Sequence, residues 1–153
     1  MAEWSTVRND PNYPEPLDAE IIPLCDALNA AGFVTESSCC GHGYRNPAVW
    51  FEHSTDERIE SLARFVIRRE SGDYKPHYSV FEKEILFEGY RWALHIHVSD
   101  VYGNTPEVES LKKSVQAITE VTRSIEDWFA SERAAVTLVA NPTDAPYRNE
   151  PSY

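Results

Sequence analysis

The chain has 153 residues, with 25 acidic and 14 basic side chains and a formal net charge of −11. This charge opposes binding to a large nucleic acid, which needs a concentrated lysine and arginine surface. The length fits one domain that can bury a core without disulfides or a structural metal. Two of the three cysteines are adjacent, which is a poor arrangement for a disulfide.

The two ends of the chain differ in composition from its middle. Residues 1–16 are polar and rich in proline and predict an extended arm, without the basic start and apolar run of a secretory signal. No apolar stretch approaches the ~20 residues that span a bilayer. We therefore expect a cytoplasmic protein without membrane contact, with a single domain over 17–140 and an extended tail over 141–153.

From Leu17 onward the apolar residues recur at helical spacing, and Gly32 is placed to end this predicted helix. Strands are predicted over 33–39 and 48–53, on either side of a glycine turn. A second helix follows, with Ser54 and Glu57 as a capping box and an end near Gly72. The apolar stripe of the first helix is formed by Ile21, Leu24, Cys25, Leu28 and Ala31.

Two further strands are predicted over 77–87 and 90–98, joined at Glu88-Gly89 as a hairpin. A third helix opens at Thr105-Pro106 and runs to about Ala134. Its length of roughly 40 Å exceeds the width of a compact domain of this size. We expect that it either breaks near Ser124 or packs against a second copy, which would make a homo-oligomer through 105–134.

This order of elements, α-β-β-α-β-β-α, predicts an α+β fold with an antiparallel or mixed sheet and helices packed on one face. In the last strand, apolar residues alternate with Arg91, His95 and His97. If helices cover the apolar face, both histidines project from the open face of the sheet and are available for a site.

The glycine turn combines thiols, an imidazole, hydroxyls and glycines in one short segment. Its residues are Ser37, Ser38, Cys39, Cys40, Gly41, His42 and Gly43. Glycines let backbone N–H groups turn toward a ligand, and cysteine and histidine suit metal binding or nucleophilic chemistry near neutral pH. Ordinary core packing does not call for this mixture, so the turn predicts a functional site.

One interpretation is a pocket for a small anion. Hydroxyls and glycine N–H groups would cradle the anion, while histidine and arginine side chains contact its charge. Trp50 and Trp92 could stack on a flat ring. The predicted ligand-binding residues are Ser37, Ser38, Cys40, Gly41, His42, Gly43, Arg91, His95 and His97.

A second interpretation is a transition-metal site, for which zinc is the best match. Its predicted ligands are Cys39, Cys40, His42 and His95. A third interpretation is a cysteine nucleophile with a histidine base. In that case Cys40 is better placed than Cys39, because Cys39 is expected to share a strand face with Phe33 and Thr35.

The chain also resembles the wybutosine-synthesis protein 3 family, tRNA-modifying methyltransferases whose turn reads Ser-Ser-Cys-Ser-Gly-Arg. The likeness covers about residues 17–125. It is carried by Ser37, Ser38, Cys39 and Gly41 in the turn, by Leu24 and Leu28-Asn29 upstream, and by Phe87-Glu88 and Leu94-His95 in the hairpin. The family's third serine and its arginine are Cys40 and His42 here.

The Cys-Cys-Gly-His-Gly variant is more similar to a group of small bacteriophage and bacterial proteins with a Ser-Cys-x-Gly-His-Gly turn. That likeness implies a protein that binds a nucleotide-like anion and sequesters or alters a nucleotide signal. The methyltransferase resemblance implies instead an enzyme that uses S-adenosylmethionine on RNA or a nucleotide. A zinc-supported interaction module is the third expectation, and the sequence leaves open whether the protein is an enzyme.

Overall fold

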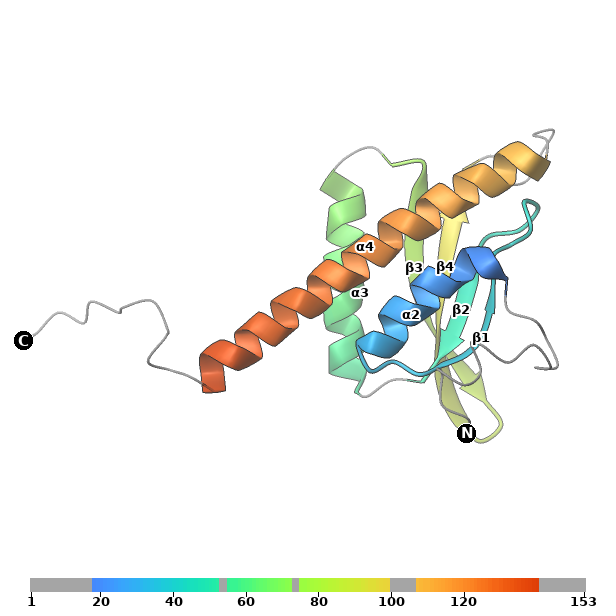
Figure 1. Cartoon of the computed structure of the whole chain (residues 1–153). Helices are drawn as coiled ribbons and strands as arrows, with labels where there is room; N and C mark the ends of the chain where they lie inside the picture. The colour runs from blue at the N-terminus through green and yellow to red at the C-terminus, as the bar shows by residue number, and fades with distance from the viewer. Residues whose placement is uncertain (1–17, 53–54, 73–74, 100–106, 141–153) are drawn as a thin grey trace, which may run out of the picture.

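The computed structural model describes residues 18–52, 55–72, 75–99 and 107–140 (Figure 1). These residues form three α-helices and one four-stranded antiparallel sheet in the order α-β-β-α-β-β-α. The predicted α+β class and the predicted order of elements are confirmed. The predicted arm 1–16 and tail 141–153 lie outside the described residues.

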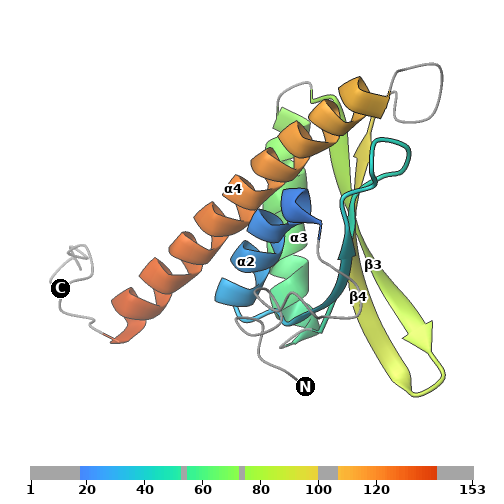
Figure 2. The same cartoon turned by 45° about the vertical axis from the view of Figure 1, so that its right-hand side comes forward.

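The sheet has the strand order β1-β2-β4-β3. Two short strands, β1 (Thr35–Cys39) and β2 (Ala48–Phe51), lie beside two longer ones, β3 (His77–Leu86) and β4 (Gly89–Val98). All neighbouring strands run antiparallel. Because β3 and β4 are the longer pair, their hairpin extends beyond the helices (Figure 2).

Helices cover only one face of this sheet (Figure 2). They are α2 (Ile22–Ala30), which continues the short 3₁₀ turn η1 (Ala19–Ile21), α3 (Asp56–Gly72) and α4 (Glu107–Ala140). Every residue of the stripe predicted for the first helix is buried. The apolar residues Leu94, Ile96 and Val98 of β4 are buried too, so the opposite face of β4 is the open face.

Aromatic rings connect the helices to the sheet at the centre of the core. The Phe33 ring lies 5.8 Å from the Phe51 ring and 5.9 Å from the Trp128 ring, between centroids. The guanidinium of Arg58 lies over Phe33 and Trp128 and pairs with Glu132. An α3 side chain thus joins the loop before β1 to the middle of α4.

The third helix differs from the prediction. It is one continuous helix of 34 residues, and the expected break near Ser124 is wrong, because Ser124 and Ile125 are buried in the middle of it. The last turns leave the domain (Figure 1), and the side chains from 133 to 138 are exposed. The predicted contact with a second copy stays a prediction.

Element ends differ by a few residues from those expected. The first strand begins at Thr35 rather than 33, and the second ends at Phe51 rather than 53. The Thr55 hydroxyl accepts the Arg58 N–H at 3.2 Å and caps α3. The expected cap Ser54 and the expected helix start at Thr105-Pro106 lie outside the described residues.

Within the described ranges, no helix combines the length and the apolar character that crossing a bilayer requires.

The aromatic cluster predicts a large difference between two phenylalanine substitutions. Phe33→Ala should lower the free energy of unfolding by about 3–5 kcal/mol, because it leaves a cavity beneath Phe51 and Trp128. Phe87→Ala is the matched control: Phe87 is fully exposed on the hairpin, so the change should stay within about 0.5 kcal/mol. Urea unfolding followed by circular dichroism measures both, and equal losses would contradict the assigned core.

Candidate functional site

The backbone of the glycine turn is left-handed at three successive residues. The φ angles of Gly41, His42 and Gly43 are 83°, 53° and 83°, a region that L side chains rarely adopt. A Cβ on Gly41 would lie 2.0 Å from the Arg45 carbonyl oxygen, and one on Gly43 would lie 2.4 Å from the Glu107 carbonyl oxygen. Sterics therefore require both glycines.

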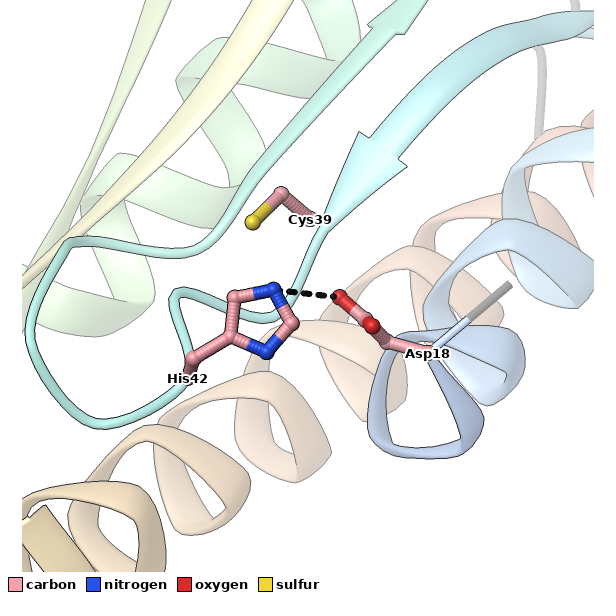
Figure 3. A group of neighbouring side chains, drawn as sticks. All are labelled: Asp18, Cys39 and His42. Carbon is pink, nitrogen blue, oxygen red and sulfur yellow. Dashed lines mark ion pairs between the residues drawn. The ribbon is translucent and has the colours of Figure 1, made fainter. Parts of the chain in front are cut away.

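Asp18 brings a carboxylate to this turn from just before η1. It occupies the N-cap position of η1 but makes no capping hydrogen bond. Instead, its Oδ2 accepts the Cys40 N–H at 2.9 Å and lies 3.6 Å from Nε2 of His42. Figure 3 shows the carboxylate and the imidazole facing each other, with Cys39 beside them at the end of β1.

Three potential metal ligands converge here. One donor atom each from Asp18, Cys39 and His42 lies within 4.8 Å of the other two. Zinc bonds to nitrogen and oxygen of about 2.0–2.2 Å, at tetrahedral angles, place two such donors about 3.4 Å apart. The separation of 3.6 Å between His42 Nε2 and Asp18 Oδ2 matches this spacing closely.

Cys39, rather than Cys40, is the thiol on the open face. A β-bulge shifts the register between Thr35 and Ser37. Thr35 faces α2, where its hydroxyl accepts a hydrogen bond from Asn29 at 2.8 Å. After the bulge, Cys39 lies in one cross-strand row with Ala48 and His95. The expectation that Cys39 shares a face with Thr35 is wrong, because the extra residue reverses the alternation.

Cys40 is buried, with 2% of its surface exposed. Its Sγ accepts the His42 N–H at 3.4 Å and lies 3.8 Å from Nδ1 of the same ring. These contacts hold His42 in place. Burial raises the pKa of the Cys40 thiol to about 11, and a thiol with a raised pKa is a poor nucleophile near neutral pH. The burial of Cys40 argues against the predicted preference for Cys40 over Cys39 as a nucleophile.

The two serines of the turn point to opposite faces. Ser38 lies in a row with Val49 and Leu94, on the face that the helices cover. Ser37 is paired with Trp50 and is exposed on the other face. Of the two predicted serine ligands, only Ser37 is on the open face.

Two N–H groups of the turn donate to nearby side chains, one within the turn and one outside it. The Cys40 N–H donates to the Asp18 carboxylate, and the Gly41 N–H donates to Sγ of Cys39 at 3.3 Å. Two N–H groups of the turn, that of Gly41 among them, are therefore already engaged by protein side chains rather than free for an anion. This arrangement favours a cation over an anion within the turn itself.

His95 belongs to a second group on the open face of the sheet. Donor atoms of Glu82, Glu84 and His95 lie within 4.8 Å of one another. Glu84 accepts hydrogen bonds from Trp50 Nε1 at 3.0 Å and from Arg91 Nε at 2.8 Å. These two bonds lower the pKa of Glu84. The Arg91 guanidinium also lies over the Trp50 ring at 5.6 Å.

The predicted four-ligand metal set is thus divided. Cys39 and His42 meet at the turn, while His95 joins carboxylates from β3. His97 stacks on Tyr78 with 4.7 Å between ring centroids, and its Nδ1 lies 3.3 Å from the Asn46 amide nitrogen. Since Asn46 also accepts the Val98 N–H, the contacts of His97 hold the loop before β2 against β4.

Sequence reasoning missed three of the clustered carboxylates. Asp18 lies far upstream of the turn, and no local pattern connects the two. Glu82 and Glu84 did carry a signal, because the hairpin register sets them opposite Ala93 and Arg91. Residues directly opposite in a hairpin share a face, so both carboxylates belong with His95.

The left-handed turn predicts an effect of adding single methyl groups. Gly41→Ala and Gly43→Ala should each lower the free energy of unfolding by at least about 2 kcal/mol, through strain and contact with backbone oxygens. Gly72→Ala is the control, because a Cβ there meets nothing within 4 Å. Calorimetric melting measures all three, and unchanged stability in the first two would contradict the turn geometry.

Burial predicts unequal reactivity of the three thiols. Burial also raises the pKa of Cys25 to about 11, whereas Cys39 is only half-buried. At pH 8 a thiol of pKa about 11 is deprotonated in roughly one molecule in a thousand. Iodoacetamide with a chelator should therefore label Cys39 first, with labelling of the other two rising about tenfold per pH unit.

Mass spectrometry of the intact protein follows this labelling. Cys39→Ser should remove the fast phase, and a fast phase that persists in this variant would contradict the assignment.

No protein-family model, no curated protein and no solved structure matches this chain. The resemblance to the wybutosine-synthesis protein 3 family, which rests on short motifs, stays a prediction. A proposal of function must therefore rest on the geometry of the turn.

Proposed function

We propose that this protein binds a divalent transition metal ion, zinc above all, through Asp18, Cys39 and His42, and that the metal recruits a small anionic ligand of nucleotide type. The observation that carries the proposal is the convergence of these three donors within 4.8 Å. They reach one point from two segments of the chain, through the hydrogen bond between Asp18 and the Cys40 N–H.

The chemistry of the donors supports a transition metal. Calcium and magnesium take oxygen ligands almost exclusively, whereas a set of one thiolate, one imidazole and one carboxylate suits zinc and related ions. Three protein ligands also leave one coordination position for water or an exogenous ligand, as in catalytic zinc sites. The His42 side chain is 47% exposed, so this position would face solvent.

Each proposed ligand is oriented by a neighbouring group, as is usual in metal sites. Nδ1 of His42 lies 3.8 Å from Cys40 Sγ, which leaves Nε2 toward Asp18. The Gly41 N–H donates to the Cys39 sulfur and fixes its position. The Cys40 N–H fixes Oδ2 of Asp18, so little rearrangement would be needed on metal binding.

The open face beside Cys39 supports a ligand with an anionic group and a flat ring. Ser37 and Trp50 are directly opposite each other, and Cys39 is opposite Ala48 in the next row on that face. An anionic group on the metal would place the rest of a nucleotide-sized molecule along this surface, toward Trp50 and Arg91. An aromatic ring and a guanidinium both favour stacking with a base.

The test is metal binding by single-residue variants. We expect one zinc per chain by elemental analysis and native mass spectrometry, with an affinity at least about 100-fold weaker in Asp18→Asn, Cys39→Ser and His42→Ala. His97→Ala and Cys25→Ser are the matched controls, since neither belongs to the cluster, and both should retain the metal. Equal zinc affinity in all five variants would reject the site.

The same proteins test the ligand. Calorimetric titration with adenosine monophosphate should show tighter binding to zinc-loaded than to zinc-free protein, and Trp50→Ala should reduce the difference. Equal binding with and without zinc would reject the recruitment step while leaving the metal site in place.

A further inference from the structure

We propose a second binding site, specific for the phosphate group of a small phosphorylated molecule, in the groove between α3 and α4. Two adjoining hollows form this groove. One has a volume of about 400 Å³ and the other of about 580 Å³. Arg68 and Arg69 line both hollows. Volumes of this size are typical of small-molecule sites.

Positive charge is concentrated in the first hollow, although the chain as a whole carries −11. Four cationic side chains line it, against the carboxylates Glu70 and Glu120. The cations come from α3, from the segment before β3 and from α4: they are Arg68, Arg69, Lys75 and Arg123. Because salt screens distant charges over about 8–10 Å, the local excess rather than the net charge acts on a ligand here.

Two of these cations are available to a ligand. Arg69 pairs with Asp127 at 2.5 Å, and Lys75 lies 3.6 Å from Glu120. Arg68 and Arg123 make no ion pair or side-chain hydrogen bond with any residue that the structure describes. The two arginines belong to different helices and line the same hollow.

The carboxylates of the hollow are engaged with other partners. Glu70 accepts the N–H and the hydroxyl of Ser79, both at 2.8 Å, and lies 3.4 Å from Nε2 of His77. Glu120 lies 3.6 Å from Nδ1 of His77 and from Nζ of Lys75. His77 is 3% exposed between them. The carboxylates are thus directed at this buried imidazole and leave the arginines to the ligand.

Guanidinium groups suit a phosphate, since their planar N–H donors form paired, charge-assisted hydrogen bonds with its oxygens. A phosphate also carries up to about two negative charges, against one for a carboxylate. The second hollow is lined by Phe65 and Trp128 as well as by arginines. It offers an apolar wall for the organic part of the molecule. A large nucleic acid fits poorly, because its backbone would extend beyond the groove over a protein whose net charge is −11.

This site goes beyond the proposed metal function and shares no residue with it. Its residues belong to α3, to α4 and to the chain from Lys75 to the start of β3. The metal ligands are Asp18, Cys39 at the end of β1 and His42 in the turn that follows. A chelator therefore distinguishes the two sites, because it would remove a metal ion from the first and leave binding in the groove unchanged.

The test uses the full chain in the presence of a chelator at low ionic strength. Inorganic phosphate and ribose 5-phosphate are titrated and followed by nuclear magnetic resonance shifts and calorimetry. We expect saturable binding of both, weakened about tenfold in Arg68→Gln and in Arg123→Gln. Arg133→Gln is the matched control, an exposed α4 arginine outside both hollows, and should bind as the wild type does.

Four outcomes would overturn the proposal, and the first three concern the groove alone. These are absence of saturable phosphate binding by a folded wild type, equal affinity in the wild type and both groove variants, or a clear preference for a single-stranded RNA over both phosphate probes. Binding that disappears in His42→Ala but persists in Arg68→Gln would assign the anion to the turn and also overturn the groove.

Discussion

One extra residue in β1 controls which chemistry this protein presents. Between Thr35 and Ser37 the strand bulges against β2, and every later side chain of β1 changes face. Thr35 is thereby bonded to Asn29 beneath α2, while Cys39 reaches the open face. Without the bulge, Cys39 would be buried under α2, and the turn would have no accessible thiol beside His42.

Electrostatics decides what the turn can bind. A left-handed turn with glycines suggests a nest of N–H donors for an anion, but here the Cys40 N–H donates to the Asp18 carboxylate and the Gly41 N–H to the Cys39 sulfur. The turn consequently presents a carboxylate, a sulfur and a ring nitrogen to a cation. The anion site that we propose lies elsewhere, at the arginines between α3 and α4. The proposed cation site and the proposed anion site thus lie on different parts of the fold.

Local periodicity made most of the fold predictable, because helix stripes and strand alternation depend on neighbouring residues alone. The hairpin and the open-face position of His95 follow from that pattern. The sequence pattern predicted a packed Cys39 and an accessible Cys40, the reverse of what the structure shows. It could not do otherwise, because a bulge leaves no periodic signal in the sequence. Asp18 and the arginine groove depend on tertiary packing between segments far apart in sequence, which no spacing rule reports.

The continuous helix α4 touches both proposed sites. Its first residue, Glu107, has its carbonyl oxygen where a side chain on Gly43 would lie. Glu120 and Arg123 line the groove, about 20 Å further along the axis. An unbroken α-helix is stiff over this distance, so a displacement of α4 along its axis moves a wall of the groove and a support of the turn together. The two proposed sites therefore share one rigid support, although they lie on different parts of the fold.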